Sequence, residues 1–384
     1  MRVSPREMIE RLVSFPTVSR DSNLPLIHFV RDYLAAHGVE SRLVPNADGT
    51  KANLYATVGP REEGGVVLSG HTDVVPVDGQ PWDTDPFTVV EKDGRLYGRG
   101  TADMKSFSAI GLALVPEMLE RGLRHPIHFA LSYDEEVGCV GAPAMIAEMA
   151  ENVPRPRAVI VGEPTSMKVV NAHKGILHVD THVRGHEVHS SQVHRGVSAV
   201  MVGARLVVFL EDMMRENAAR AEPGCPFEPP YTTIHCGVIK GGTALNIMAR
   251  DCTFVTDIRS IPEDDPMSFV ERYRAHVAEH VEPAMQAIAP DTFVKIEHSS
   301  LVPGLRPEPD GEAEALAKAL TGENRAGAVV YAAEAGQFQG AGFSVVMCGP
   351  GSIDQAHQPN EFIALDQVDA GVAFMRRLID RLAG

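Results

Sequence analysis

The chain has 384 residues, of which 44% are hydrophobic and 22% charged, so it is long enough for two globular domains with sizeable cores. Its formal net charge of −16 argues against binding to nucleic acid or to anionic membranes, both of which require basic surfaces. Five cysteines without a Cys-x-x-Cys pair, a charged N-terminus in place of an apolar signal core, and no apolar run of membrane-spanning length predict a cytoplasmic protein with reduced thiols.

The first part of the chain alternates helices with strands. Ser4-Pro5-Arg6-Glu7 is a capping box with proline at the first helical position, and it predicts the start of a helix. Further helices are expected to end at Gly38, to cover residues 105–121 before Gly122, and to cover residues 141–149. Buried strands are expected at residues 53–58, 65–68, 127–133 and 158–162, and a hairpin is expected around Asp93-Gly94. This alternation predicts an α/β fold with a mostly parallel sheet covered on both faces.

The pattern changes between residues 176 and 300. Strands are expected at 176–183, 231–239, 251–261 and 293–297, and helices at 197–216 and 266–288. This βαββαβ order is the ferredoxin-like, or split βαβ, sandwich. The helix–strand alternation resumes after residue 301. The sequence therefore predicts a discontinuous catalytic domain, residues 1–175 and 301–384, and an inserted α+β domain, residues 176–300.

Five short segments place carboxylates and histidines at the ends of apolar runs. In α/β proteins, loops at strand ends present functional groups, so the five together predict a hydrolase that uses a pair of divalent metal ions. The segments are Ser-Gly-His71-Thr-Asp73, Gly-Arg-Gly-Thr-Ala-Asp103, Asp134-Glu135-Glu136-Val-Gly138, Gly162-Glu163-Pro-Thr and Gly351-Ser-Ile-Asp-Gln-Ala-His357.

Each segment also has an ordinary structural explanation. His71 and Asp73 lie on one face of an extended chain, which suits a ligand imidazole oriented by a carboxylate, but Asp73 could equally cap a turn. Asp103 precedes a predicted helix and either caps it or bridges two ions. Three adjacent acids such as Asp134, Glu135 and Glu136 usually lie on a solvated loop. Directly after a buried strand, however, their mutual repulsion requires a cation nearby. One glutamate can then bind the metal while its neighbour acts as the base. A lone histidine is more often an ordinary surface or core residue, so His357 is a candidate metal ligand only because the other four segments are present.

These motifs resemble those of the M20 family of metallopeptidases and amidohydrolases, and the resemblance covers nearly the whole chain. It implies a dizinc site with His71 and Glu163 on one ion, Glu136 and His357 on the other, and Asp103 bridging them. It also implies that Asp73 orients His71 and that Glu135 is the general base. Cobalt or manganese could replace zinc in such a carboxylate-rich site. The matching segments are Ser-Gly-His71-Thr-Asp73-Val-Val-Pro, Tyr97-Gly-Arg-Gly-Thr-Ala-Asp103-Met-Lys, Asp134-Glu-Glu-Val-Gly and Gly349-Pro-Gly-Ser-Ile-Asp-Gln-Ala-His357-Gln-Pro.

The inserted domain resembles the lid and dimerisation domain of the family, which implies a homodimer. Gly185-His-Glu-Val-His189-Ser-Ser is similar to the segment whose histidine reaches the partner's site and stabilises an oxyanion. Relatives usually have a proline where Val193 stands here, so His189 is the expected residue, and His186 and His194 are competitors.

Substrate-binding residues are also implied by the resemblance. Asn246 and Arg259 lie in stretches similar to those that bind the substrate carboxylate, and a guanidinium suits bidentate binding of a carboxylate. The alternative for Arg259 is an exposed side chain on a surface strand. Glu334, in Tyr331-Ala-Ala-Glu334-Ala, resembles the glutamate of a Thr-Glu-Ala stretch and is expected to meet the substrate's side-chain ammonium.

The implied reaction is hydrolysis of a small N-acyl amino acid, most specifically of N2-acetyl-L-ornithine to L-ornithine and acetate, in arginine biosynthesis. Within the family, a succinyl-diaminopimelate desuccinylase, an aminoacylase or a dipeptidase remain alternatives. From other classes, a non-catalytic metal-binding interaction protein is disfavoured by the presence of both Glu135 and Glu136. A two-metal phosphoesterase would share the carboxylate and histidine ligands.

Overall fold

The computed structural model describes residues 2–384 and falls into two compact units. The first comprises Met1–Ala172, Leu305–Ala328 and Ala333–Gly384, and the second comprises His173–Gly304 and Val329–Ala332. The main junctions follow residues 172 and 304, where the sequence predicted 175 and 300, and residues 329–332 belong to the second unit. Over residues 2–384, every helix is too short or too polar to span a lipid bilayer.

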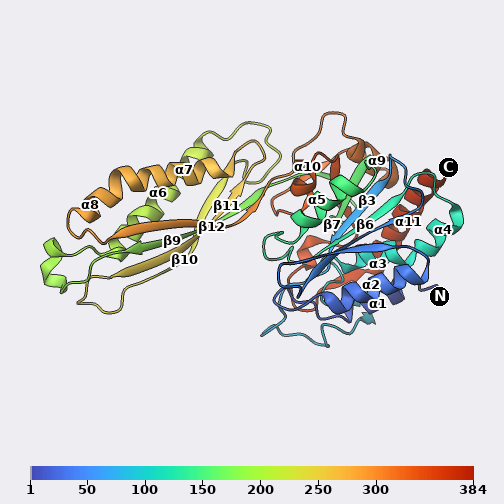
Figure 1. The fold of residues 1–384 in the computed structure, drawn as a ribbon, viewed down its shortest axis with the longest axis horizontal. Helices are drawn as coiled ribbons and strands as arrows, with labels where there is room; N and C mark the ends of the chain where they lie inside the picture. Colours follow the sequence, from blue (N-terminus) through green and yellow to red (C-terminus); the bar gives the residue numbers. More distant parts are fainter. Residues whose placement is uncertain (1) are drawn as a thin grey trace. The chain divides into compact units, whose positions relative to one another are not determined.

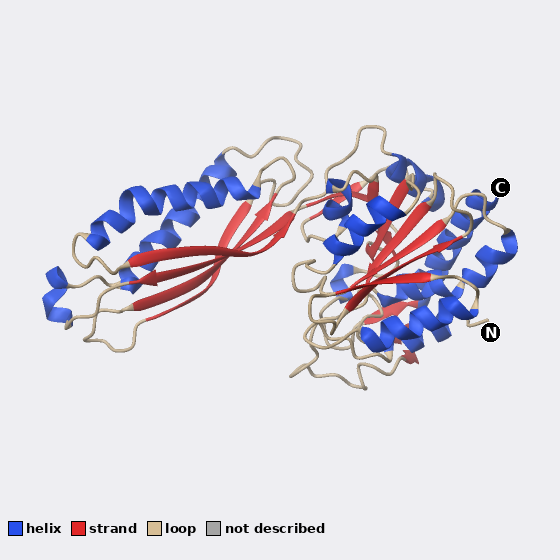
Figure 2. Ribbon diagram, in the orientation of Figure 1, coloured by secondary structure: helices blue, strands red, loops and turns tan. Residues whose placement is uncertain are grey.

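The first unit is built on an eight-stranded sheet in the order β1-β2-β6-β3-β7-β14-β8-β13 (Figures 1 and 2). The four central strands β6, β3, β7 and β14 are parallel, whereas β1, β2 and β8 are antiparallel to their inner neighbours. The predicted parallel sheet is thus confirmed at the centre. The strands are β1 Ser41–Pro45, β2 Ala52–Val58, β3 Val66–His71, β6 Ile127–Ser132, β7 Ala158–Pro164, β8 Val170–His173, β13 Gly327–Val329 and β14 Val345–Gly349.

Helices cover both faces of this sheet (Figure 1), as predicted. On one face α3 (Lys105–Ala113) packs against β3 and β7, and α1 (Pro5–Val13) and α11 (Leu365–Ala383) pack against α3. The other face carries α5 (Ala142–Asn152) and α10 (Ala335–Gly340). Every residue of β3 and β6 is buried, as a strand covered on both faces requires. The remaining helices of this unit are α2 (Leu24–Ala36), α4 (Val115–Arg121) and α9 (Glu312–Thr321).

The sequence predicted correctly where α1 begins, but it predicted one helix where the structure has two, α3 and α4. The capping box at Ser4 and Glu7 is formed in both directions. The single helix expected over residues 105–121 is instead two helices, α3 and α4, separated at Leu114. Pro116 lies in the first turn of α4, where its missing N–H and fixed φ are tolerated, so the chain starts a new helix there. Gly122 ends α4 with a φ of 67°, as predicted.

A small three-stranded sheet, β15-β5-β4, joins two distant parts of the first unit. Its strands are β4 (Val90–Lys92), β5 (Arg95–Tyr97) and β15 (Phe362–Ala364), and all are antiparallel. The predicted turn at Asp93-Gly94 is confirmed, because both residues have positive φ, as a type I′ hairpin turn requires. The pairing of β15 with β5 brings the residues just before β15 next to the loop that follows β5.

The second unit has the predicted βαββαβ order and an antiparallel sheet in the order β10-β11-β9-β12. Its helices lie on one face of the sheet (Figure 1), and side chains of β11 alternate between buried and accessible. The helix expected over residues 266–288 is α7, a π-helical turn at Val277–Val281, and α8. The elements are β9 Gly175–Arg184, α6 Ala199–Ala219, β10 Thr233–Gly241, β11 Asp251–Ser260, α7 Pro266–His276, α8 Glu282–Gln286 and β12 Phe293–Val302.

Candidate metal centre

The acidic and histidine side chains of the five predicted segments converge at one edge of the parallel sheet. Parallel strands end at the same edge, so segments far apart in the chain meet there. His71 is the last residue of β3, Glu163 lies near the end of β7, Glu135 and Glu136 follow β6, and His357 follows β14. Together with Asp73 and Asp103, they form a mostly buried cluster.

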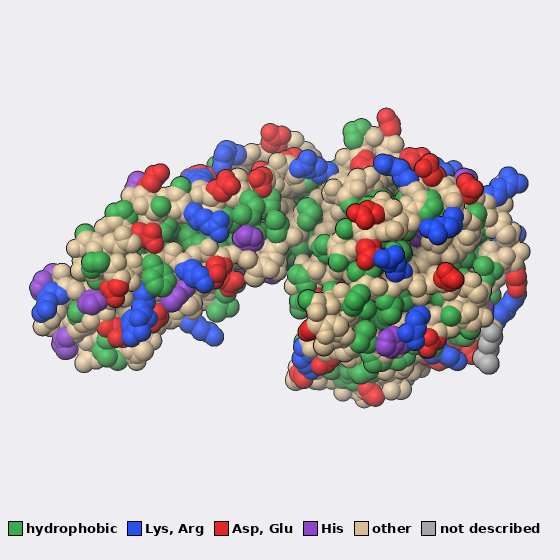
Figure 3. All heavy atoms as spheres, viewed as in Figure 1, with side chains coloured by type: hydrophobic (Ala, Val, Ile, Leu, Met, Phe, Trp, Pro, Cys, Tyr) green, Lys and Arg blue, Asp and Glu red, His purple; other side chains and the backbone are tan. Residues whose placement is uncertain are grey.

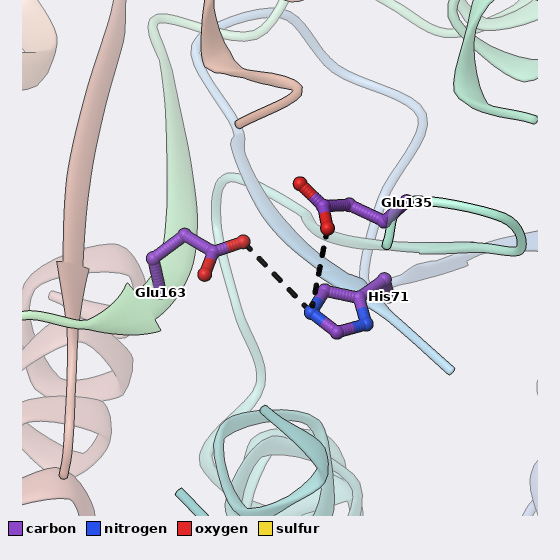
Figure 4. Close-up of side chains that lie close together, drawn as sticks. All are labelled: His71, Glu135 and Glu163. Atoms are coloured by element: carbon purple, nitrogen blue, oxygen red, sulfur yellow. Dashed lines mark ion pairs between the residues drawn. The ribbon is translucent and has the colours of Figure 1, made fainter. Parts of the chain in front are cut away.

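His71 contacts three carboxylates through one ring nitrogen. Its Nε2 lies 3.0 Å from Asp103 Oδ1. The same atom lies 4.0 Å from both Glu135 Oε2 and Glu163 Oε1 (Figure 4). Its Nδ1 lies 2.9 Å from the main-chain oxygen of Asp73. A carbonyl oxygen can only accept, so Nδ1 carries a proton and Nε2 is the atom that faces the cluster.

Asp103 connects His71 with His357. Its Oδ1 faces His71, and its Oδ2 lies 3.4 Å from His357 Nε2, which is also 3.0 Å from Glu136 Oε2. Asp103 does not cap α3, since the N-cap of that helix is Met104. The side chain of His357 is 52% exposed whereas those of Asp103 and Glu136 are 7% exposed, so the cluster is open to solvent on the His357 side.

Asp73 contacts His71 through its main chain, while its carboxylate has other partners. Its Oδ1 lies 3.7 Å from His71 Nδ1, and the main-chain oxygen makes the hydrogen bond to the imidazole instead. The carboxylate accepts hydrogen bonds from the backbone N–H groups of Glu135, at 3.2 Å, and Glu136, at 3.3 Å. The Ser19 hydroxyl also donates to it, at 2.7 Å. Asp73 therefore orients His71 through its main chain and holds the loop of both glutamates through its side chain.

The cluster concentrates negative charge where little water can screen it. Burial raises the pKa of Glu135, Glu136 and Glu163, and the charge of Asp103 raises it further. Hydrogen bonds to Asp103 and Glu136 raise the pKa of His357 to about 10. Burial lowers the pKa of His71, but the surrounding carboxylates outweigh burial and raise it well above its usual value. The site therefore favours bound positive charge, which protons or cations can supply.

The donor atoms fit divalent cations. Among residues 2–384, Glu163 Oε1 is one of a few buried side-chain atoms without a hydrogen-bond partner, and it points toward His71 Nε2. Two sets, His71 with Glu135 and Glu163, and His71 with Asp103 and Glu136, have ligand atoms within 4.8 Å of one another. Imidazole and carboxylate donors suit zinc and other first-row divalent ions.

Glu334 lies beside the cluster but offers no surface to a ligand. It is fully buried, and its carboxylate accepts hydrogen bonds from the hydroxyls of Ser69, at 3.3 Å, and Ser132. Burial raises the pKa of this carboxyl group. The expected contact with a substrate ammonium is therefore not supported, because the side chain is enclosed by the carboxyl ends of β3 and β6.

The predicted oxyanion-stabilising residue, His189, and the predicted substrate-binding residues Asn246 and Arg259 belong to the second unit, and their roles stay predictions. His189 is exposed, with Nδ1 at 2.8 Å from the Ser191 hydroxyl. Asn246 is exposed in the loop after β10. Arg259 lies on β11, and its Nε donates to both carboxylate oxygens of Asp257, at 3.0 and 2.9 Å.

Sequence reasoning missed the residues that support the cluster. The buried thiol of Cys139 donates to Glu135 Oε1 at 3.2 Å, which leaves Oε2 facing His71. Ser19 reaches Asp73 from a loop 54 residues away in sequence. The only sequence signal for this support was the cysteine four residues after Glu135. The sequence does not show that its thiol bonds the Glu135 carboxylate; the structure does.

Comparisons with known proteins agree with this geometry. The model of peptidase family M20/M25/M40 matches residues 67–381. Acetylornithine deacetylase of Pasteurella multocida is 33% identical, with 98% of this chain and 97% of that protein covered. The enzyme of the same name from Proteus mirabilis is 34% identical, with 97% and 95% covered.

Solved structures show the same fold. A metallo-carboxypeptidase of the M20 family from Sulfolobus solfataricus superimposes with a TM-score of 0.78 at 17% identity, with 99% of each chain covered. A dinuclear metal-binding peptidase of this family from Bacillus subtilis gives a TM-score of 0.63 at 14% identity, with 98% of this chain and 97% of that chain covered.

We expect divalent cations to stabilise the protein more at about pH 8 than at about pH 6, because metal ligands must lose their protons. Burial raises the pKa of Glu136 and Glu163, so protons compete more strongly with a cation at the lower pH. The cation-free protein should show the opposite trend. A carboxyl group whose pKa is raised on folding stabilises the folded state below its ordinary pKa. That contribution is lost as the pH rises through the folded-state value, which is about 8 for Glu135.

The measurement is the melting temperature of chelator-treated protein with and without zinc at both pH values. At about 100 times the dissociation constant, zinc should add about 2.7 kcal/mol. Glu163→Gln keeps the side-chain volume but removes a ligand, so it should reduce the gain. An equal gain at both pH values, or an undiminished gain in the variant, would contradict the assignment of the site.

Proposed function

This chain belongs to peptidase family M20/M25/M40, and we propose that it hydrolyses the amide bond of a small N-acyl amino acid, with N2-acetyl-L-ornithine as its substrate. As a member of this family it is a metal-dependent amidohydrolase. The observation that carries the proposal is the position of Asp103. Its two oxygens face two different histidines, and each histidine is accompanied by a glutamate. This arrangement suits two neighbouring cations.

The proposed ligands divide into two sets that share Asp103. His71 and Glu163 would hold one zinc ion, and Glu136 and His357 would hold the other, with one Asp103 oxygen directed to each. When bound, such a pair lowers the pKa of a water molecule and polarises the acyl oxygen of the substrate. Zinc is proposed from the nature of the donors, and cobalt or manganese would suit the same carboxylate-rich site.

Glu135 is the proposed general base. The Cys139 thiol donates to one of its oxygens, and the other faces the cluster across from Glu163 (Figure 4). Burial raises the pKa of this carboxyl group above its ordinary value, which makes the ionised form a stronger proton acceptor than an exposed glutamate. Glu135 would take the proton of the attacking water and later deliver it to the leaving amine.

Replacement of the two adjacent glutamates should separate catalysis from metal binding. Glu135→Gln should keep the bound metal and lose turnover by about 10³-fold or more, because the amide cannot accept the proton. Glu136→Gln should lower metal affinity as well, since it removes a ligand. Metal content by elemental analysis and kcat under saturating cation would distinguish the two effects. Turnover like that of the wild type in metal-loaded Glu135→Gln would remove Glu135 from the role of base.

We further propose that Arg259 and Asn246 bind the substrate carboxylate. The Nε of Arg259 is held by Asp257 through two contacts of about 3 Å, an orientation that leaves its terminal nitrogens for a bidentate ligand. Since Glu334 is buried, the preference for an ornithine side chain is supported by the similarity to the acetylornithine deacetylases and not by an identified contact.

A hydrolysis screen tests the proposed substrate. The metal-reconstituted protein should act on N2-acetyl-L-ornithine with a higher kcat/KM than on succinyl- or formyl-amino acids, dipeptides or a generic phosphoester. Arg259→Lys should raise KM more than it lowers kcat, because an ammonium group cannot make the bidentate contact. Preference for succinyl-diaminopimelate or for a dipeptide would reject the acetylornithine assignment while keeping the chemistry. Activity on the phosphoester alone would reject the amidohydrolase assignment.

We also propose that the second unit forms a homodimer and that His189 acts in the partner's site. β10 is an outer strand of its sheet, and Val238 and Ile239 on it are 50% and 51% exposed. Figure 3 shows other hydrophobic side chains on the surface of this unit, among charged ones. Unpaired strand edges can pair with the same edge of a second copy about a two-fold axis.

We propose a cytoplasmic location as well, which the five free cysteines suit.

Mixing two inactive variants tests the partner's contribution. Glu135→Gln keeps His189, and His189→Ala keeps the base, so a mixed dimer contains one site with both groups if His189 acts in trans. After subunit exchange the mixture should therefore be more active than either variant alone. A monomer in analytical ultracentrifugation, or no recovery of activity in a mixture shown to exchange, would reject the proposal.

A further inference from the structure

Glu361 is a buried carboxylate surrounded by donors from the loop that carries Asp103. It accepts hydrogen bonds from Arg99 Nη1 at 2.7 Å and from three backbone N–H groups, those of Gly100, Ala102 and Asp103, at 3.0, 2.8 and 3.0 Å. Both Glu361 and Arg99 are 1% exposed. A carboxylate that accepts three backbone N–H groups fixes the path of the chain that donates them, here the chain that ends at Asp103.

The small sheet explains why residues so distant in sequence meet. Phe362 on β15 lies opposite Tyr97 on β5, so Glu361, just before β15, lies beside the loop that follows β5. The backbone N–H of Gly98 also donates to the main-chain oxygen of Glu361, at 2.9 Å. The register of this pairing therefore places the Glu361 carboxylate next to the backbone of residues 100–103, where it accepts their N–H groups.

Arg99 extends the same network to His357. Its Nη2 donates to Gln80 Oε1 at 2.6 Å, and Gln80 Nε2 donates to the main-chain oxygen of His357 at 2.9 Å. Trp82 Nε1 donates to the same Gln80 oxygen at 3.0 Å, and the Arg99 guanidinium lies 5.2 Å from the centre of the Trp82 ring. The chain of contacts from Glu361 through Arg99 and Gln80 thus ends at the backbone of His357.

The two proposed cation positions are therefore supported in different ways. His71 and Glu163 lie on β3 and β7, where His71 pairs with Ser132 of β6 and Pro164, next to Glu163, pairs with Gly349 of β14. Asp103 and His357 lie in loops, and His357 has a φ of 62°, a conformation that residues other than glycine seldom adopt. The network of Glu361, Arg99 and Gln80 contacts the backbone of both loop residues.

We propose that Glu361 is a positioning residue for the cation held by Glu136 and His357, and that it acts through the backbone of Asp103 and, by way of Arg99 and Gln80, of His357. This inference rests on the proposed two-cation function. Hydrogen-bonded groups behind the ligands orient them, and their loss typically weakens metal binding by roughly 10- to 100-fold. Because the sheet holds His71 and Glu163 whereas Asp103 serves both cations, the loss of Glu361 should weaken the cation at Glu136 and His357 more than the other.

Cobalt titration of the full-length, chelator-treated protein tests this inference. The two cations are followed by calorimetry and by the visible absorption of bound cobalt. Wild-type protein should bind two equivalents. Glu361→Gln should bind the second equivalent roughly 10- to 100-fold more weakly and lose clearly less affinity for the first, because the sheet still holds His71 and Glu163. It should regain activity only at correspondingly higher cobalt concentrations, which a general loss of stability would not produce.

Glu361→Gln removes the buried charge that pairs with Arg99, and this loss alone could prevent folding. A second variant keeps the test decisive in that case. Gln80→Leu breaks the contact between Arg99 and His357 without leaving a buried charge. It should weaken the second equivalent only, because Gln80 contacts the backbone of His357 and not that of Asp103. The matched control is Glu314→Gln, since Glu314 bonds Asn171 and Lys318 and has no contact with the cluster. It should bind both equivalents like the wild type.

The outcomes separate this inference from the proposed function. If the wild-type protein binds fewer than two cations, the two-cation function fails, and the positioning role fails with it. If the wild type binds two, and a folded Glu361→Gln binds both with unchanged affinity, the positioning role alone is wrong. Equal weakening of both equivalents would also overturn it, because it would show an effect on the whole unit and not on one cation position.

Discussion

Repulsion between buried carboxylates is the constraint on which this site depends. Asp103, Glu135, Glu136 and Glu163 lie around His71 and His357 at the end of a parallel sheet, where burial removes the water that would screen their charges. Positive charge has to compensate for them, and the two histidines, whose pKa values are raised by these carboxylates, supply only part of it. The same repulsion that makes the cluster unfavourable without cations makes it a strong ligand for them. Burial, followed by the neighbouring carboxylates, raises the pKa of Glu135 above its ordinary value.

Such a cluster is tolerated only if its members are held rigidly, and the first unit does this in several ways. Strand pairing positions His71, opposite Ser132, and Glu163, next to the pairing of Pro164 with Gly349. Asp73 accepts the backbone N–H groups of Glu135 and Glu136 and so fixes their loop. Glu361 accepts those of the Asp103 loop. Asp73 and Glu361 thus use the same property, acceptance of backbone N–H groups, to position the loops that carry the proposed base and two of the proposed ligands.

Asp73 and Glu334 both lie at the positions that the resemblance to the M20 family predicts, but the contacts of their carboxylates differ from the expected ones. Asp73 stands where the motif predicts, yet its main-chain oxygen, and not its carboxylate, contacts His71. Glu334 also lies next to the cluster, but Ser69 and Ser132 enclose it. In both cases the role depends on which way the side chain points and what surrounds it, and a sequence motif contains neither.

The sequence by itself determined the α/β class, the ferredoxin-like order of the inserted region and the five segments of the cluster, because periodicity, turn residues and acidic strand ends are local signals. It did not reveal the break between α3 and α4, which depends on how Pro116 is accommodated. Nor did it reveal the Glu361 network, since Glu361, Arg99 and Gln80 are far apart in the chain. Only the tertiary structure decided these contacts, because hydrogen bonds between distant segments depend on strand register and loop path.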